Sequence, residues 1–291
     1  MTEITSLPLT DWYAAATPAR QAQAADALES GHVLELPQLE FTLDLAEAAL
    51  LSPEMAATAK NVSLSPDGAV LRGIECDEAE RKLLHGMMRR YQTQARALVQ
   101  TLLPGYAVAL QPGRTSFRPA QIEGRTTSWR KDDTRLHVDS FPSSPTAGWR
   151  ILRVFSNIHP GGQARHWRLG EPFDHVAARF LPAMRAPLWG SSRLMQTLGL
   201  TKQRRTPYDH YMLGLHDAMK ADMAYQASAP QQRHEFAAGT SWLVYTDQAS
   251  HAAMRGQHAM EQTFLVPVKA MTDAARSPLR VLEGLLGRAL V

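Results

Sequence analysis

The chain has 291 residues, 44% of them hydrophobic, and a formal net charge of +3 at pH 7. This length allows a sizeable core, and the charge is too small to indicate a nucleic-acid-binding protein without a recognisable binding motif. The single cysteine, Cys76, excludes an intramolecular disulfide and a multi-cysteine zinc site, and it favours a reducing cytoplasm. The N-terminus lacks signal-peptide character, and no run of about 18 apolar residues predicts a membrane-spanning helix.

The first third of the chain, residues 1–105, is predicted to be a mainly helical region that packs on a later core. Residues 18–29 are rich in alanine, follow Thr17 as a candidate cap and end before Gly31. HVLELP then has the composition of a short strand. Residues 77–103 carry apolar side chains at helical spacing until Pro104-Gly105 ends the pattern, which predicts a long helix that supports a sheet.

Residues 106–291 have the pattern of a β-rich catalytic core. Short segments rich in β-branched or aromatic residues predict strands, namely YAVAL, TTSWR, RLHVDSF and RILRVFSNI, followed late in the chain by GTSWLVYTD and MEQTFLVPV. Between the two strand sets, residues of about 174–226 predict a helical insert. Because strands and helices do not alternate, the fold class is α+β with a sandwich or jelly roll, and a single elaborated domain is expected.

The most informative motif is His137-Val138-Asp139. On a strand, two side chains separated by one residue point to the same face. An imidazole and a carboxylate on one face supply two corners of a facial triad, which a second histidine completes to bind non-heme Fe(II). His251, between two late strand-like segments, is the leading candidate for the third ligand. The rival candidates are His258, His234 and His216.

Basic residues flank this motif. Those singled out as candidate anion-binding residues are Arg118, Arg125, Arg130, Lys131, Arg135 and Arg168, and Arg165 is a further candidate. Guanidinium groups fit carboxylates and phosphates well, although a solvated surface is the alternative for any one of them. Arg153 and Asn157 fall on one face of the segment RILRVFSNI. An arginine among apolar residues must be paired, so Arg153 either clamps a dicarboxylate or forms a salt bridge with a core acid.

These residues together resemble the Fe(II)/2-oxoglutarate-dependent dioxygenases. RPAQIEGRTTSWRKDDTRLHVDSFPSSPTAGWRILRVFSNIHPGGQARHWRLGEPF and the later TDQASHAAMRGQHAMEQTF resemble, more narrowly, the hydroxylases of 3-deoxy-D-manno-oct-2-ulosonic acid (Kdo). The resemblance implies a double-stranded β-helix, or jelly roll, and hydroxylation of Kdo at C3 in the inner core of lipopolysaccharide, giving succinate and CO2. It implies iron bound by His137, Asp139 and His251, with 2-oxoglutarate and O2 as co-substrates and ascorbate as an optional reductant.

One departure from the superfamily concerns the co-substrate. Many members carry a basic residue shortly after the distal histidine, where this chain has Met260 and Glu261, with Gln262 next. The resemblance therefore leaves Arg153, together with Asn157 and Gln262, as the expected co-substrate contacts. The flanking arginines and Lys131 are then expected to contact the carboxylate of Kdo and the phosphates of lipid A.

Two other classes of function stay open from the sequence. One is a cupin-like metal enzyme of another reaction class, such as an isomerase, and the other is a non-enzymatic module that binds anionic glycans. The C-terminal segment 277–291 has a leucine stripe with nearby arginines, which indicates either docking on its own domain or contact with an anionic membrane surface. The expected partner is Kdo-containing lipid A, met in the cytoplasm or at the inner face of the cytoplasmic membrane. The pattern predicts no particular oligomeric state.

Overall fold

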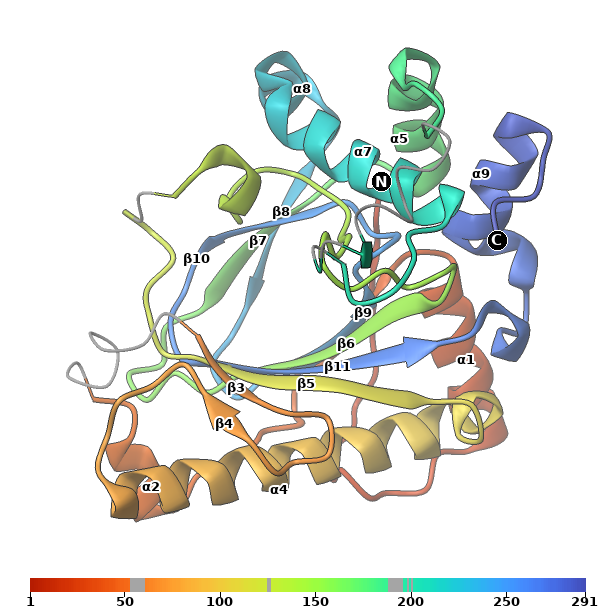
Figure 1. Cartoon of the computed structure of the whole chain (residues 1–291). Helices are drawn as coiled ribbons and strands as arrows, with labels where there is room; N and C mark the ends of the chain where they lie inside the picture. The colour runs from red at the N-terminus through yellow and green to blue at the C-terminus, as the bar shows by residue number, and fades with distance from the viewer. Residues whose placement is uncertain (53–60, 125–126, 188–195, 198, 200) are drawn as a thin grey trace.

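The computed structural model describes residues 1–52, 61–124, 127–187, 196–197, 199 and 201–291. Two β-sheets face one another in it (Figure 1). The large sheet has the strand order β1 (Ile4–Ser6), β2 (Val33–Leu36), β9 (Ser241–Tyr245), β6 (Arg150–Asn157), β11 (Ala259–Val266), β5 (Gln111–Arg118), β3 (Val62–Leu64) and β4 (Leu71–Arg72). The small sheet has the order β10 (His251–Arg255), β7 (Arg165–Leu169) and β8 (Gln232–Phe236). All neighbouring strands are antiparallel except β1 and β2.

The long helix α4 (Glu78–Leu102) runs along the outer face of the large sheet (Figure 1). It begins at Asp77, whose side chain accepts a hydrogen bond from Glu80 N while the Glu80 side chain accepts one from Asp77 N. This reciprocal cap satisfies two backbone donors. The apolar stripe of α4 enters the main hydrophobic core, and Tyr91 donates a hydrogen bond to Val154 O on β6. The sequence prediction of a helix that supports a sheet is confirmed.

The remaining N-terminal elements join the same sheet and core. Helix α1 (Pro18–Glu29) lies near β2 and α4, and α2 (Leu45–Ala49) lies beside α4. Residues before 105 also supply β1 and β2 to one edge of the large sheet and β3 and β4 to the other edge. The N-terminal region therefore extends the sheet as well as covering it.

A second group of helices lies on the side of the molecule opposite α4 (Figure 1). It comprises α5 (Phe173–Phe180), α7 (Pro207–Ala221), α8 (Met223–Ser228) and α9 (Pro278–Leu286). Three of them fall between β7 and β8, which confirms the helical insert and the jelly-roll class. Leu279 and Leu282 of α9 are buried in a core shared with α5 and α7, so α9 docks on its own domain. Within the described ranges, no helix combines the length and apolarity needed to cross a bilayer.

Three of the predicted strands, YAVAL, TTSWR and RLHVDSF, are not regular strands in the structure. In YAVAL, Tyr106 ends a 3-10 turn and the next residues form a turn in which Val108 is fully exposed. Tyr106 instead donates a buried hydrogen bond to Glu29, which holds the turn in place. In TTSWR, Trp129 and Arg130 begin a 3-10 turn, and Arg125 and Thr126 lie outside the described residues.

The strand that replaces YAVAL, β5, contains Pro112 and Gly113, which are unfavourable in a strand interior. Its pairing with β11 shifts register between Gln262 and Phe264, so the extra residue is accommodated as a bulge. A Cβ on Gly113 would come within 3.0 Å of Thr263 O, which explains why glycine occupies the bulge. Sequence reasoning also missed β7, β8 and β10, because their charged residues obscure the alternation that predicts strands.

Candidate metal centre

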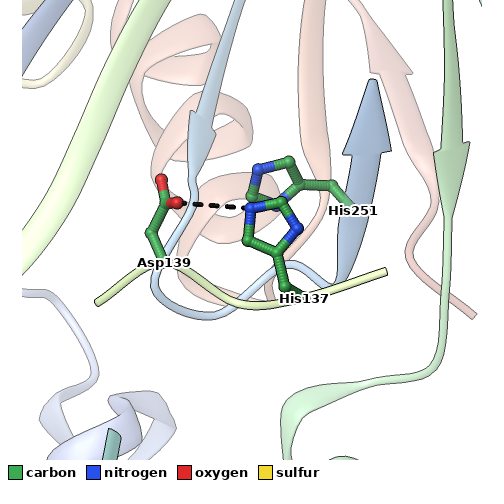
Figure 2. A group of neighbouring side chains, drawn as sticks. All are labelled: His137, Asp139 and His251. Carbon is green, nitrogen blue, oxygen red and sulfur yellow. Dashed lines mark ion pairs between the residues drawn. The ribbon is translucent and has the colours of Figure 1, made fainter. Parts of the chain in front are cut away.

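Three side chains converge between the two sheets, from His137, Asp139 and His251 (Figure 2). One ligand atom from each lies within 4.8 Å of the others, and His137 Nε2 is 3.6 Å from Asp139 Oδ1. Among the residues that the structure describes, this is the group of histidines and acids arranged to hold a metal ion. Two imidazoles and one carboxylate are the donor set of the facial triad that binds Fe(II).

Backbone hydrogen bonds bring the two parts of this centre together. The segment RLHVDSF is not the regular strand that the sequence predicted, since only His137 forms a β-bridge. His137 and His251 exchange backbone hydrogen bonds of 3.0 and 2.9 Å, and Asp139 N donates to Thr246 O at 2.7 Å. His251 begins β10 and Thr246 follows β9, so the short β9–β10 connection fixes both ends of the motif.

The tautomers of the two histidines suit metal binding. Nδ1 of His137 lies 2.7 Å from Arg135 O, and Nδ1 of His251 lies 2.8 Å from Ala249 O. A carbonyl oxygen accepts only, so each Nδ1 carries the proton and each Nε2 keeps its lone pair. The same local device, a bond to the carbonyl two residues earlier, therefore orients both rings for a cation.

The protonation states also suit a cation. Burial, reinforced by the neighbouring His137, lowers the pKa of His251 to about 4, and burial lowers the pKa of His137 as well. Burial alone would raise the pKa of Asp139, but Arg153 and the two imidazoles outweigh it and hold that pKa well below its usual value. At neutral pH the centre thus presents two neutral imidazoles and a carboxylate, the forms that bind metals.

The three residues line a pocket with about 360 Å³ of empty space, part of which is open to solvent. Its wall also contains three arginines, two from the large sheet and one from the small sheet, namely Arg118, Arg153 and Arg165. Trp167 lines the pocket too, and its ring stacks on the imidazole of His251 with centroids 5.2 Å apart. The pocket wall therefore combines three guanidinium groups with the indole ring of Trp167.

A chain of ion pairs links the pocket wall to the carboxylate of the centre. Glu261 on β11 pairs with Arg118 at 2.6 Å and with Arg153 at 3.1 Å. Arg153 Nη2 then lies 3.0 Å from Asp139 Oδ2. Arg153 thus makes the salt bridge to a core acid that was one of its two alternatives, while it also lines the pocket.

The candidate anion-binding residues lie in several places. Arg118 lines the pocket, whereas Arg130 pairs with Asp217 and stacks on Trp129. Arg135 donates to Asp132 and to Lys220 O, and Lys131 is exposed. Arg168 donates to Thr134 O and to the Gln231 side chain. Arg125 lies outside the described residues.

Two of the expected co-substrate contacts point elsewhere. The Asn157 amide donates to the carbonyls of Gln163 and Phe236, which joins the end of β6 to the small sheet. Gln262 neighbours Glu261 on β11 and therefore faces the opposite side of the sheet, where it accepts a hydrogen bond from Thr115. Neither residue is part of the pocket wall.

The rival histidines have other partners. His234 pairs with Glu35 at 2.9 Å, and His258 lies against the rings of Phe117 and His159. His216 on α7 is nearer, with its ring 5.4 Å from that of His137, but its Nδ1 lies 3.0 Å from Asp217. His216 therefore borders the centre and packs edge-on against the first ligand.

Sequence reasoning did not single out Asp133 or Glu261 as functional residues, and it gave Arg165 little weight. Asp133 and Arg165 line the pocket, and Glu261 connects two of its arginines. For Glu261 the sequence did contain one indication of a functional role, because this chain has an acid near the position where many members of the superfamily have a basic residue. Arg165 was named only as a further candidate for binding the substrate's anions, and its position in the pocket wall was not predicted because β7 was not recognised as a strand.

Comparison with known proteins gives a consistent result. Residues 11–289 match the family model described as 3-deoxy-D-manno-oct-2-ulosonic acid (Kdo) hydroxylase. The crystal structure of the Kdo hydroxylase KdoO, a non-heme Fe(II) alphaketoglutarate-dependent dioxygenase, in complex with alphaketoglutarate and Fe(III) is 46% identical. Its TM-score is 0.96, over 100% of this chain and 98% of that chain. KdoO in complex with cobalt(II) is also 46% identical with a TM-score of 0.96, over 99% and 97% of the two chains. No curated protein matches the chain in sequence.

Proposed function

The chain belongs to the Kdo hydroxylase family, and from that premise we propose that His137, Asp139 and His251 hold its catalytic iron. It is a non-heme Fe(II)/2-oxoglutarate-dependent dioxygenase that hydroxylates Kdo. The observation that supports these ligands most strongly is the convergence of two Nε2 lone pairs and one carboxylate in a charged pocket.

Fe(II) and 2-oxoglutarate supply oxidative chemistry in which one atom of O2 enters the sugar, the other enters succinate, and CO2 leaves. The protein's own residues bind, orient and balance charge around that reaction. The charges of three arginines, Arg118, Arg153 and Arg165, equal in number those of three acids, Asp133, Asp139 and Glu261. A bound Fe(II) would leave the site with an excess charge of about +2, which a dicarboxylate co-substrate matches.

We assign the distal carboxylate of 2-oxoglutarate to the cationic wall formed by Arg153 and Arg165. Arg165 lines the pocket from β7 and is 3% exposed, so we assign it a direct bidentate contact with this carboxylate. Asn157 and Gln262 would then contribute only the hydrogen bonds that join their strands to neighbouring segments. Trp167 excludes water from the same end of the pocket and holds the plane of the His251 ring.

We assign the carboxylate of Kdo to Arg118, whose side chain is 27% exposed and therefore reachable by a substrate. The reaction proposed is hydroxylation at C3 of a Kdo unit attached to lipid A. Arg130 and Lys131 precede the pocket residue Asp133 in the chain and Arg135 follows it, so all three are placed to contact further anionic groups of such a glycolipid. Arg168 faces away from the pocket and supports the segment before His137 through Thr134 O.

The proposed location is the cytoplasm, with contact at the inner face of the cytoplasmic membrane where a lipid-linked substrate would be met. The free thiol of Cys76 is compatible with a reducing compartment. Leu285 and Val291 at the C-terminal end are 50% and 61% exposed, and they are the apolar residues available there for a membrane surface.

A direct test measures succinate and the mass of the product on Kdo-lipid A with Fe(II) and 2-oxoglutarate. Wild type is expected to add one oxygen to the glycolipid, and Asp139→Ala and His251→Ala to add none. A Lys131→Ala control is expected to keep the chemistry with a higher KM. Hydroxylation by Asp139→Ala at the wild-type rate would contradict the assigned iron site.

A further inference from the structure

Glu261 is a buried acid that pairs with two arginines of the pocket wall, Arg118 and Arg153. It lies on β11, is 3% exposed and faces the same side of the sheet as Arg153 and Phe155. Its Oε2 contacts Arg118 at 2.6 Å, its Oε1 contacts Arg153 at 3.1 Å, and Thr263 lies at 3.5 Å from the same oxygen. A buried carboxylate costs free energy in such a place unless its partners compensate, so its presence calls for a physical reason.

Arg153 supplies that reason, because it lies between two carboxylates. Its Nη2 is 3.0 Å from Asp139 Oδ2, and its Nη1 is 3.1 Å from Glu261 Oε1. The other oxygen of Asp139, Oδ1, is the one directed at His137 Nε2. Arg153 therefore orients Asp139 so that one oxygen faces the proposed metal position and the other is held by the guanidinium.

An arginine in contact with a metal-binding carboxylate also repels the metal. Two positive charges a few ångströms apart in a buried site interact strongly, because little water screens them. Glu261 places a negative charge on the far side of the same guanidinium and offsets this repulsion. Arg118, which has a second acid in Asp133 at 4.0 Å, holds Glu261 from the other side.

We propose that Glu261 is a positioning residue that keeps Arg153 on the outer oxygen of Asp139 and neutralises it, so that the centre can accept a divalent cation. This inference rests on the proposed metal site at His137, Asp139 and His251. Many members of the superfamily have a basic residue near this position, whereas the role proposed here depends on the negative charge of Glu261. Glu261 touches neither metal nor substrate and acts through Arg153.

The proposal has a signature that a merely structural salt bridge lacks. Loss of the Glu261 charge leaves the pocket with one more positive charge. Metal affinity should then fall, while the affinity for the dianionic 2-oxoglutarate at saturating metal should stay equal or rise. Loosening of the fold would instead weaken the binding of both ligands.

The test uses Co(II) as an air-stable metal probe on the full chain, with affinity measured by absorption titration. Glu261→Gln is expected to raise the Kd for Co(II) by about tenfold, and the KM for 2-oxoglutarate at saturating Fe(II) should not rise. Glu261→Asp, which restores the charge, should recover most of the Co(II) affinity. The matched control is Glu47→Gln. Glu47 is another buried glutamate; it lies on α2 and pairs with Arg90 on the neighbouring helix α4 (Figure 1). The control should leave both quantities unchanged.

The outcomes separate this inference from the proposed function. If wild type binds Co(II) and His137→Ala does not, the metal site stands. Equal Co(II) affinity of wild type and Glu261→Gln would then overturn the role of Glu261 alone. A parallel loss of Co(II) and 2-oxoglutarate affinity in Glu261→Gln would also overturn it, in favour of a structural role. Failure of wild type to bind Co(II) through His137 would overturn the metal site itself.

Discussion

Acidification is the perturbation that tests the electrostatics of the metal centre most sharply. A metal competes with protons for imidazole nitrogen, so the apparent affinity falls once the pH drops below the pKa of a ligand. An ordinary imidazole with a pKa of about 6.5 would weaken binding by about tenfold at pH 5.5. Burial beside His137 lowers the pKa of His251 to about 4, and burial lowers that of His137 in the same direction. The His251 ring should therefore stay neutral well below pH 6.5, and the His137 ring should take up its proton at a lower pH than an ordinary imidazole.

The expected result is a Kd for Co(II) that rises by less than about tenfold between pH 7.5 and pH 5.5, the loss that one ordinary imidazole would cause by itself. Two ordinary imidazoles would together weaken binding by about a hundredfold over the same interval. The assay is an absorption titration in buffers that do not bind metal, with circular dichroism recorded at each pH to verify the fold. His258→Gln is a control, because His258 also has a pKa lowered to about 4 but lies outside the pocket wall. A hundredfold loss would refute the claim that burial keeps both ligands ready for the metal.

Three further predictions concern stability, each measured as the free energy of unfolding in denaturant. Burial lowers the pKa of His258 to about 4, so the unfolded state takes up a proton at this residue at a higher pH than the folded state does. The free energy of unfolding should therefore fall as the pH drops from about 6.5 to about 4. His258→Gln should reduce this fall, and a pH profile identical to that of wild type would contradict the prediction. Asp247→Asn leaves the fully buried Arg150 without its ion-pair partner and should lower the free energy of unfolding by about 3–5 kcal/mol. In the control, Asp26→Asn removes an exposed ion pair with Arg276 and should lower it by less than about 1 kcal/mol. Leu282→Ala should cost about 2–5 kcal/mol and the half-exposed Leu285→Ala much less, whereas equal costs would mean that α9 is not docked as described.

The sequence predicted the large elements of the fold for local reasons. The apolar spacing of residues 77–103 and the stop at Pro104-Gly105 indicated α4, and the β-branched composition of 150–158 indicated β6. Strand β5 escaped because Pro112 and Gly113 contradict strand propensity, and only pairing with β11 across a bulge makes that strand favourable. Such pairing joins residues far apart in the chain, so no local pattern contains it.

The candidate site divides in the same way. The spacing of His137 and Asp139 and the position of His251 indicated the three residues that the structure brings together. The geometry that unites them comes from backbone bonds to Thr246 and His251 rather than from a regular strand. The ion pairs of Arg153 and the position of Arg165 in the pocket wall depend on how the two sheets pack against each other. The spacing of residues within one segment does not reveal that packing.

The most direct test of the central claim follows the oxygen atoms. Wild type is incubated with Fe(II), 2-oxoglutarate, Kdo-lipid A and isotopically heavy dioxygen, and both products are analysed by mass spectrometry. The account predicts one heavy oxygen in the Kdo unit, one in succinate, and neither product with Asp139→Ala. Product formation without label in the sugar or in succinate would contradict a dioxygenase centred on His137, Asp139 and His251.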